Sequence, residues 1–312
     1  MKIRKLIYKL KGVFLEFHNP YEYILQRLFD KNGNHNELDR RIGLRNSKID
    51  VKKLRESYWN FRYPVTFYQE KERKAYLLSY YPYYIEPIYE ILKIIPIDKL
   101  DRIFKKPFLR GTFIGGGPAP EILRYGVVLE IKPSQKDLVL SYVIDIEVRQ
   151  WDKELDFTCL ELSKHYWNGV IMPLPIKFDL SSLNKFRDPK IYKAFKGNFF
   201  VIQNCLNEFY YDQEIMYKFI KEIIALMMPG SILLIIDVDN ANKIGKKIKC
   251  MIDSCNFATC LGGNVSDKPE INFPFIDYPS LLEEELFTNE SYLWPRRKTE
   301  YIYLVIERIS NN

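Results

Sequence analysis

The sequence is short of the residues that mark several large classes of protein. Its 312 residues include only 3 histidines and 5 cysteines, and no CxxC pair is present. An odd, small number of cysteines argues against a disulfide scaffold and predicts a reducing, cytoplasmic compartment. Cys250, Cys255 and Cys260 recur at a spacing that zinc knuckles do not use. The sequence therefore predicts no metal site.

Long hydrophobic runs are also missing. The most apolar stretch, Ile223–Val238, is interrupted by Pro229, Gly230 and Ser231, so it predicts a helix, a turn and a strand rather than a membrane span. We therefore expect no integral membrane association. With 47% hydrophobic residues, 14 glycines and 17 prolines, the composition excludes collagen-like and disordered chains and is sufficient for a sizeable core.

Acidic residues are scarce in the first third of the chain. Residues 1–110 hold 24 Lys and Arg against 13 Asp and Glu, whereas the remainder holds 23 against 27. The whole net charge of +7 therefore originates in the first third. Such an asymmetry predicts an anionic partner, RNA first, bound through residues 1–110; a lysine-rich composition without a partner is the alternative. Nothing in the sequence indicates an oligomeric state.

The hydrophobic pattern changes at Phe108. Before it the spacing predicts only helices, and after it short apolar runs alternate with helical segments, which is typical of a parallel sheet covered on both faces. We predict an α/β chain with a helical, basic N-terminal region at 1–107 and a Rossmann-like domain at 108–312.

The predicted helices of the first region are Pro20–Phe29, Leu54–Phe61 and Lys74–Ile95, the last kinked or split at Pro82 and Pro87. The predicted strands are Leu109–Ile114, Val139–Ile144, Ile176–Phe178, Phe199–Ile202, Ser231–Val238 and Glu300–Arg308. The tyrosines on either side of Pro82 can stack on bases or pack in the core.

A glycine-rich turn joins the first predicted strand to the next helical segment. Gly115, Gly116 and Gly117 are followed by Pro118, a residue well tolerated in a first helical turn. Glycines let the backbone approach a ligand, and the free N–H groups of the helix start face it. Asp145 ends the second predicted strand, where a carboxylate can accept both ribose hydroxyls. The pattern predicts a nucleoside site; a tight turn without a ligand is the alternative.

The segment Phe113-Ile-Gly-Gly-Gly-Pro-Ala-Pro-Glu121 resembles the first motif of the class I S-adenosylmethionine-dependent methyltransferases. Asp145 matches the acid after their second strand, Asp179 the acid beside adenine, and Asn198–Glu208 the fourth-strand motif that borders the methyl group. The resemblance covers residues 108–309. It implies a mostly parallel seven-stranded sheet with an antiparallel last strand, and S-adenosylmethionine bound between Gly115–Gly117, Pro118, Asp145, Asp179 and Asn204.

Two residues depart from the family pattern. Phe113 stands where many members carry an acid that reaches the methionine amino group, and Ala119 stands where they carry a third glycine. An NAD-dependent Rossmann oxidoreductase is the alternative for the glycine turn, although its acid usually follows at a shorter distance. Ala75–Ile85 also resembles a helical segment of the methyltransferase-like small-ribosomal-subunit assembly proteins, whose iron–sulfur cysteines this chain lacks.

The candidate catalytic residues follow the fourth predicted strand. Asn204 and Glu208 stand where a substrate amine or hydroxyl would approach, and Glu208 can act as a base or cap the next helix. Methyl transfer depends mainly on proximity and orientation, so an obvious catalytic residue is not required. We predict an S-adenosylmethionine-dependent methyltransferase, with RNA ahead of a small molecule or protein as acceptor. A catalytically inactive scaffold or RNA-binding module of the same fold is the alternative, and the N-terminal region can serve as a lid or as a binding surface.

Overall fold

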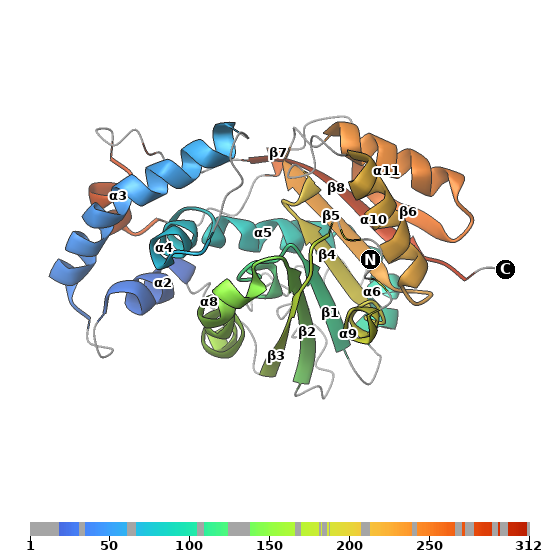
Figure 1. Ribbon diagram of the computed structural model, residues 1–312, viewed down its shortest axis with the longest axis horizontal. Coiled ribbons are helices and arrows are strands. Elements are labelled where there is room, and N and C mark those ends of the chain that lie inside the picture. Colours follow the sequence, from blue (N-terminus) through green and yellow to red (C-terminus); the bar gives the residue numbers. More distant parts are fainter. Residues whose placement is uncertain are drawn as a thin grey trace, which may run out of the picture.

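The protein is an α/β chain in which helices cover both faces of a central sheet (Figure 1). The computed structural model describes residues 19–30, 35–60, 67–104, 109–123, 138–165, 170–180, 182, 186, 188–206, 213–238, 242–265, 270–271, 278–288, 293 and 299–310. The predicted fold class is confirmed.

Seven strands of the described chain form one continuous path in the order β3-β2-β1-β4-β5-β8-β6. The first five strands of the path are mutually parallel, whereas β8 runs antiparallel to both β5 and β6. A short strand, β7 (Glu270–Ile271), pairs with β8 off this path. The strand bounds are β1 Leu109–Ile114, β2 Leu138–Asp145, β3 Val170–Lys177, β4 Phe199–Gln203, β5 Ile232–Val238, β6 Ala258–Asn264 and β8 Thr299–Arg308.

Both faces of the sheet are buried, which explains the near-continuous apolar runs in its central strands. Because side chains alternate along a strand, Phe199 and Val201 of β4 enter one core cluster, whereas Phe200 and Ile202 enter the other. The second cluster is completed by α9 (Pro189–Ala194), α10 (Gln213–Leu226) and α11 (Asn242–Ser254). Figure 1 shows α10 and α11 together on this side.

The other face is covered by the N-terminal helices and by the helical segment after β2. Helices α4, α5 and α6 and the segment 148–165 contribute buried side chains to the same cluster as β1, β2, β4 and β5. The N-terminal region and the sheet therefore share one core, and a domain division after residue 107 stays a prediction. The helix bounds are α2 Pro20–Phe29, α3 Glu37–Asn60, α4 Glu70–Ser79, α5 Tyr81–Leu92, α6 Ile97–Phe104, α8 Asp152–Asp156 and α12 Ser280–Glu285.

Several predicted elements need correction. The helix predicted at Leu54–Phe61 is the end of the much longer α3, and the strand predicted at Ile176–Phe178 is the end of the longer β3. Strand β6 was not predicted. The segment Lys74–Ile95 is split at Tyr80, because Pro82 lies in the first turn of α5; Pro87 lies inside α5 without ending it.

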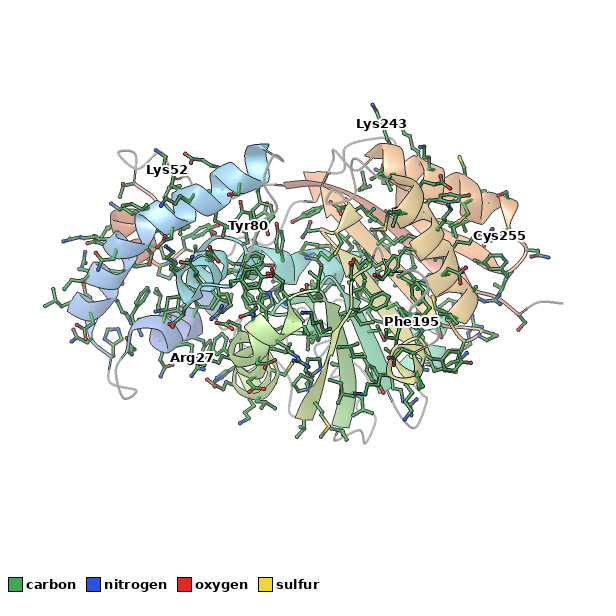
Figure 2. The ribbon with its side chains drawn as sticks, viewed as in Figure 1. Arg27, Lys52, Tyr80, Phe195, Lys243 and Cys255 are labelled. Carbon is green, nitrogen blue, oxygen red and sulfur yellow. The ribbon has the colours of Figure 1, made fainter. Side chains whose placement is uncertain are left out.

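The tyrosines around Pro82 are core residues. Tyr80, Tyr81, Tyr83 and Tyr84 are each less than a tenth exposed. The rings of Tyr76, Tyr80, Tyr84 and Tyr83 form a chain of contacts in that order. Figure 2 shows Tyr80 among the packed side chains of the helices, whereas Lys52 extends outward from α3. The packing alternative is confirmed, and these tyrosines offer no surface on which bases could stack.

Candidate nucleoside-binding site

The glycine turn after β1 needs glycine for two separate reasons. Gly115 and Gly117 have φ values of 66° and 50°, in the left-handed region that other residues rarely adopt. A Cβ on Gly115 would stand 1.9 Å from the Cys205 sulfur, so that β4 and the turn could not approach as closely. Ala119 also has a positive φ, of 51°. A glycine at this position would adopt the same backbone conformation without the strain that the alanine Cβ causes.

Asp145 lies directly beside this turn, as predicted. One carboxylate oxygen accepts a hydrogen bond from the Gly117 N–H at 3.2 Å, and the other accepts from the Glu147 N–H at 2.7 Å. Burial raises the pKa of Asp145 above its usual range, and the two N–H donors oppose that rise. The carboxylate is therefore fixed between the turn and the β2 end, with further acceptor capacity on each oxygen.

Asp179 borders a cavity at the ends of β2 and β3. The cavity has a volume of about 370 Å³ and is lined by Ile146, Lys177, Phe178, Asp179, Asp188 and Ile191. Phe178 is tied to the Asp145 carbonyl by its N–H at 3.1 Å, which places the cavity next to the glycine turn and Asp145. Three apolar side chains line this cavity together with three charged ones, two of them acids, and such a mixture suits a flat heterocycle that carries an amino group.

The end of β4 carries buried amide groups that lack partners. Asn204 has a left-handed φ of 56°, and its side-chain oxygen and nitrogen are both buried without a hydrogen bond from any described residue. The preceding Gln203 donates to the Tyr84 carbonyl at 2.8 Å, while its own side-chain oxygen is buried and unbonded. Strained backbone and unsatisfied buried amides are typical of a ligand-binding position. Cys205 is buried against the turn, and Glu208 lies outside the described residues.

One site residue was given no role by the sequence: Glu121. Only 2% of this residue is exposed, and its carboxylate lies under the glycine turn, close to Phe113. Its pKa is raised to about 8, mainly by burial and to a smaller extent by the nearby Asp145, while a hydrogen bond from its own backbone opposes the rise. An acid in a first helical turn ordinarily predicts a solvent-exposed partner of the helix dipole, so the sequence carried no signal for its burial.

The N-terminal helices are bonded to this site from above the strand ends. The Tyr81 hydroxyl contacts Thr158 at 2.6 Å, and Thr158 donates to the Pro118 carbonyl at 2.8 Å. The Phe67 N–H donates to Glu147 at 3.0 Å, and Arg73 pairs with the buried Glu154 at 3.3 Å. Trp151, fully buried, completes the contact, since its ring would lie 3.4 Å from a Cβ on Gly117. Trp151 is therefore a core residue at this junction.

The strand order distinguishes between the two folds that use such a turn. Doubly wound dinucleotide-binding domains use the order 3-2-1-4-5-6. Here an antiparallel β8 is inserted between β5 and β6, as the resemblance implied. The fold is methyltransferase-like.

Comparisons with known proteins find similarity to solved structures alone. No protein-family model and no curated protein matches the sequence. Solved structures do match, among them S-adenosylmethionine-dependent methyltransferases of several kinds. An O-methyltransferase family protein from Burkholderia thailandensis is 12% identical, with 94% of this chain and 83% of that chain covered and a TM-score of 0.43. The plantazolicin methyltransferase BamL, in complex with SAH, is 11% identical over 86% of this chain and 98% of that chain (TM-score 0.44). An rRNA methylase from Streptococcus thermophilus is 12% identical over 68% and 93% (TM-score 0.38).

Two further findings concern membrane spans and metal sites. None of the described helices is long and apolar enough to cross a membrane. In the part of the chain that the structure describes, His, Cys, Asp and Glu side chains form no group that could hold a metal ion.

Proposed function

We propose that the protein is an S-adenosylmethionine-dependent methyltransferase. The cofactor would lie along the carboxyl ends of β1, β2 and β3. Asp145 would bind the ribose hydroxyls, and the cavity bordered by Asp179 and Phe178 would hold the adenine. Gly115–Gly117 would pass beneath the amino-acid end, where any side chain on Gly115 would meet Cys205.

The observation that carries this proposal is that both ionisable groups enclosed beside the glycine turn are acids. Burial raises the pKa of each in the free protein, and a bound cation would favour their charged forms. Two carboxyl groups, Glu121 and Asp145, are enclosed there, and the charged neighbours that influence them among the described residues are acidic. A dinucleotide would place its doubly negative pyrophosphate at this helix start, against Glu121. S-adenosylmethionine carries a sulfonium and an ammonium instead, so an acidic site favours it over NAD.

The cofactor, when bound, supplies an electrophilic methyl group on a sulfonium. The residues of this chain have the task of orientation: Asp145 fixes the ribose, and Asn204 lies at the end of β4 with an unbonded amide oxygen and nitrogen that can position an acceptor. The N-terminal region adds contacts to this part of the chain through the Tyr81 hydroxyl and the Phe67 N–H. Such alignment accounts for a large share of the acceleration in transfer between two bound reactants.

Calorimetry with S-adenosylhomocysteine and with NAD tests the cofactor assignment. The full chain should bind S-adenosylhomocysteine and give no heat with NAD at the same concentration. Binding of NAD without binding of S-adenosylhomocysteine would reverse the assignment.

RNA is the acceptor class that we propose to test first. Lys52 and Lys53 are exposed on α3 and form no ion pair with any described residue. Methyl incorporation from labelled cofactor into cell extract, separated into RNA, protein and small-molecule fractions, should label RNA. Changing both lysines to alanine should reduce the salt dependence of RNA binding, because each lost phosphate contact removes about 0.7–0.9 from the slope of log K against log salt. Label in another fraction would assign the acceptor there, and cofactor binding without any incorporation would favour the scaffold alternative.

A further inference from the structure

Glu121 is an acid that the fold has buried without giving it a counter-ion. The residue is 2% exposed, and no ion pair to a described residue accompanies it. Its burial therefore costs stability, since a carboxylate in a low-dielectric site is penalised unless a cation compensates it. A polar group of this kind indicates a ligand when it faces a place that a ligand can occupy.

Glu121 lies against the glycine turn along which the proposed cofactor would pass. A Cβ built on Gly116 would lie 3.3 Å from Cγ1 of Val143, 3.4 Å from the Glu121 carboxylate oxygen Oε1 and 3.4 Å from Cβ of Phe113. The carboxylate thus reaches back from the helix after the turn to the end of β1, where Phe113 stands. On the other side of the turn stands Cys205, which follows the unbonded side chain of Asn204.

The groups that face Glu121 contain no positive charge among the described residues. Asp145, Tyr76 and the Cys159 thiol are its ionisable neighbours, and Tyr76 and Cys159 are neutral at pH 7 because burial raises the pKa of each. Glu121 is itself mostly protonated at pH 7 in the free protein, because burial raises its pKa to about 8. A cation that reaches this carboxyl would favour its charged form and pair with it. S-adenosylmethionine carries a suitable cation at its amino-acid end, in the α-ammonium group.

We propose that Glu121 binds the α-ammonium group of the cofactor, in place of the acid whose position Phe113 occupies. This inference rests on the function proposed above. It makes Glu121 a cofactor-binding residue supplied by the helix after the glycine turn rather than by β1.

The test compares two ligands that differ only in the ammonium group. S-adenosylhomocysteine and its desamino analogue are titrated calorimetrically into the wild-type chain, Glu121→Gln and the matched control Asp156→Asn, an exposed acid of α8. The wild type and the control should prefer S-adenosylhomocysteine by about 10- to 100-fold, the range of a charge-assisted hydrogen bond. Glu121→Gln should lose most of that preference while binding the desamino analogue as the wild type does.

The outcomes separate this inference from the proposed function. If the wild type binds both ligands equally, or if Glu121→Gln keeps the full preference, Glu121 does not bind the ammonium group, although the cofactor assignment stands. Equal weakening of both ligands by Glu121→Gln would indicate a structural role and overturn the inference. If neither ligand binds the wild type, the proposed function itself fails. The wild-type comparison needs no variant, so it remains decisive even if Glu121→Gln does not fold.

Discussion

Replacing Glu121 by glutamine should stabilise the free protein at alkaline pH. In the folded chain burial raises the pKa of this carboxyl from 4.5 to about 8, so the folded state holds a proton that the unfolded state has released. Stability is therefore unaffected by Glu121 below pH 4.5 and falls as the pH rises toward 8. The full loss above pH 8 is roughly 5 kcal/mol, the product of the pKa difference and about 1.4 kcal/mol per pH unit.

Glutamine has nearly the same shape and no charge at any pH. Glu121→Gln should therefore match the wild type in free energy of unfolding near pH 5 and exceed it by several kcal/mol at pH 9. Urea unfolding of the full chain at pH 5, 7 and 9 measures the difference, provided that the slope against urea is the same for both chains. Asp156→Asn, which removes an exposed acid, should leave the pH dependence of the wild type unchanged.

A constant difference between the wild type and Glu121→Gln across this pH range would refute the reasoning, because it would mean that Glu121 gains no proton on folding. The expected result would give the buried acid a physical rationale. A residue that destabilises the free protein but strengthens the binding of a cation is an instance of stability exchanged for function.

Three further changes test other parts of the structure. Gly115→Ala should lower the free energy of unfolding in urea by about 2–5 kcal/mol, because the new Cβ clashes with Cys205 at a positive φ. Gly230→Ala is the control: Gly230 has a φ of 79° but open space around it, so only the backbone strain of about 1–2 kcal/mol is expected. Equal losses for the two variants would argue against the clash. Asp145→Asn should weaken S-adenosylhomocysteine binding by about 1.5–3 kcal/mol in calorimetry, and an unchanged affinity would mean that this acid does not bind the ribose. Glu285→Gln should lower the melting temperature at pH 7 and have little effect near pH 2. Hydrogen bonds from two arginines of α3 lower the pKa of Glu285 to about 2, so the stability that its charged form contributes is lost as the pH falls toward that value. A decrease in melting temperature that does not depend on pH would exclude the ionic explanation.

The sheet could be predicted from the sequence where its strands are buried on both faces. β1 and β4 were predicted almost to the residue, because continuous apolar runs bounded by turn residues leave few alternatives. β3 was mostly missed, since Pro173 and Pro175 argue against a central strand. The structure explains them: β3 lies at an end of the strand order, where a missing N–H on the outer side is tolerated. β6 was missed because Gly262 and Gly263 lower its strand propensity.

Helix α3 shows why the first third was harder to predict. Its buried Leu44, Val51 and Leu54 lie on one face, whereas the exposed Leu38 and Ile49 lie elsewhere, so the apolar spacing does not follow a single stripe. The location of the site followed from a general rule, that ligands bind at the carboxyl ends of parallel strands, and this rule brought Asp145 to the glycine turn as predicted. The burial of Glu121 depends on neighbours far away in the sequence, and a pattern of adjacent residues cannot show it.

The charge asymmetry of the sequence has an explanation inside the molecule as well as outside it. Basic side chains of the first third pair with acids of the remainder: Arg41 and Arg45 with Glu285, Arg73 with Glu154, and Lys99 and Arg102 with Glu307. Arg55 packs over the ring of Phe287. These contacts attach the N-terminal helices to α12, β8 and the segment after β2, so part of the positive excess serves docking within the chain. Among the described residues, Lys52 and Lys53 of α3 are exposed and take part in none of these pairs, and Figure 2 shows Lys52 extending outward from the helix. Their substitution therefore tests the binding of an anionic partner without removing the pairs that dock the N-terminal helices.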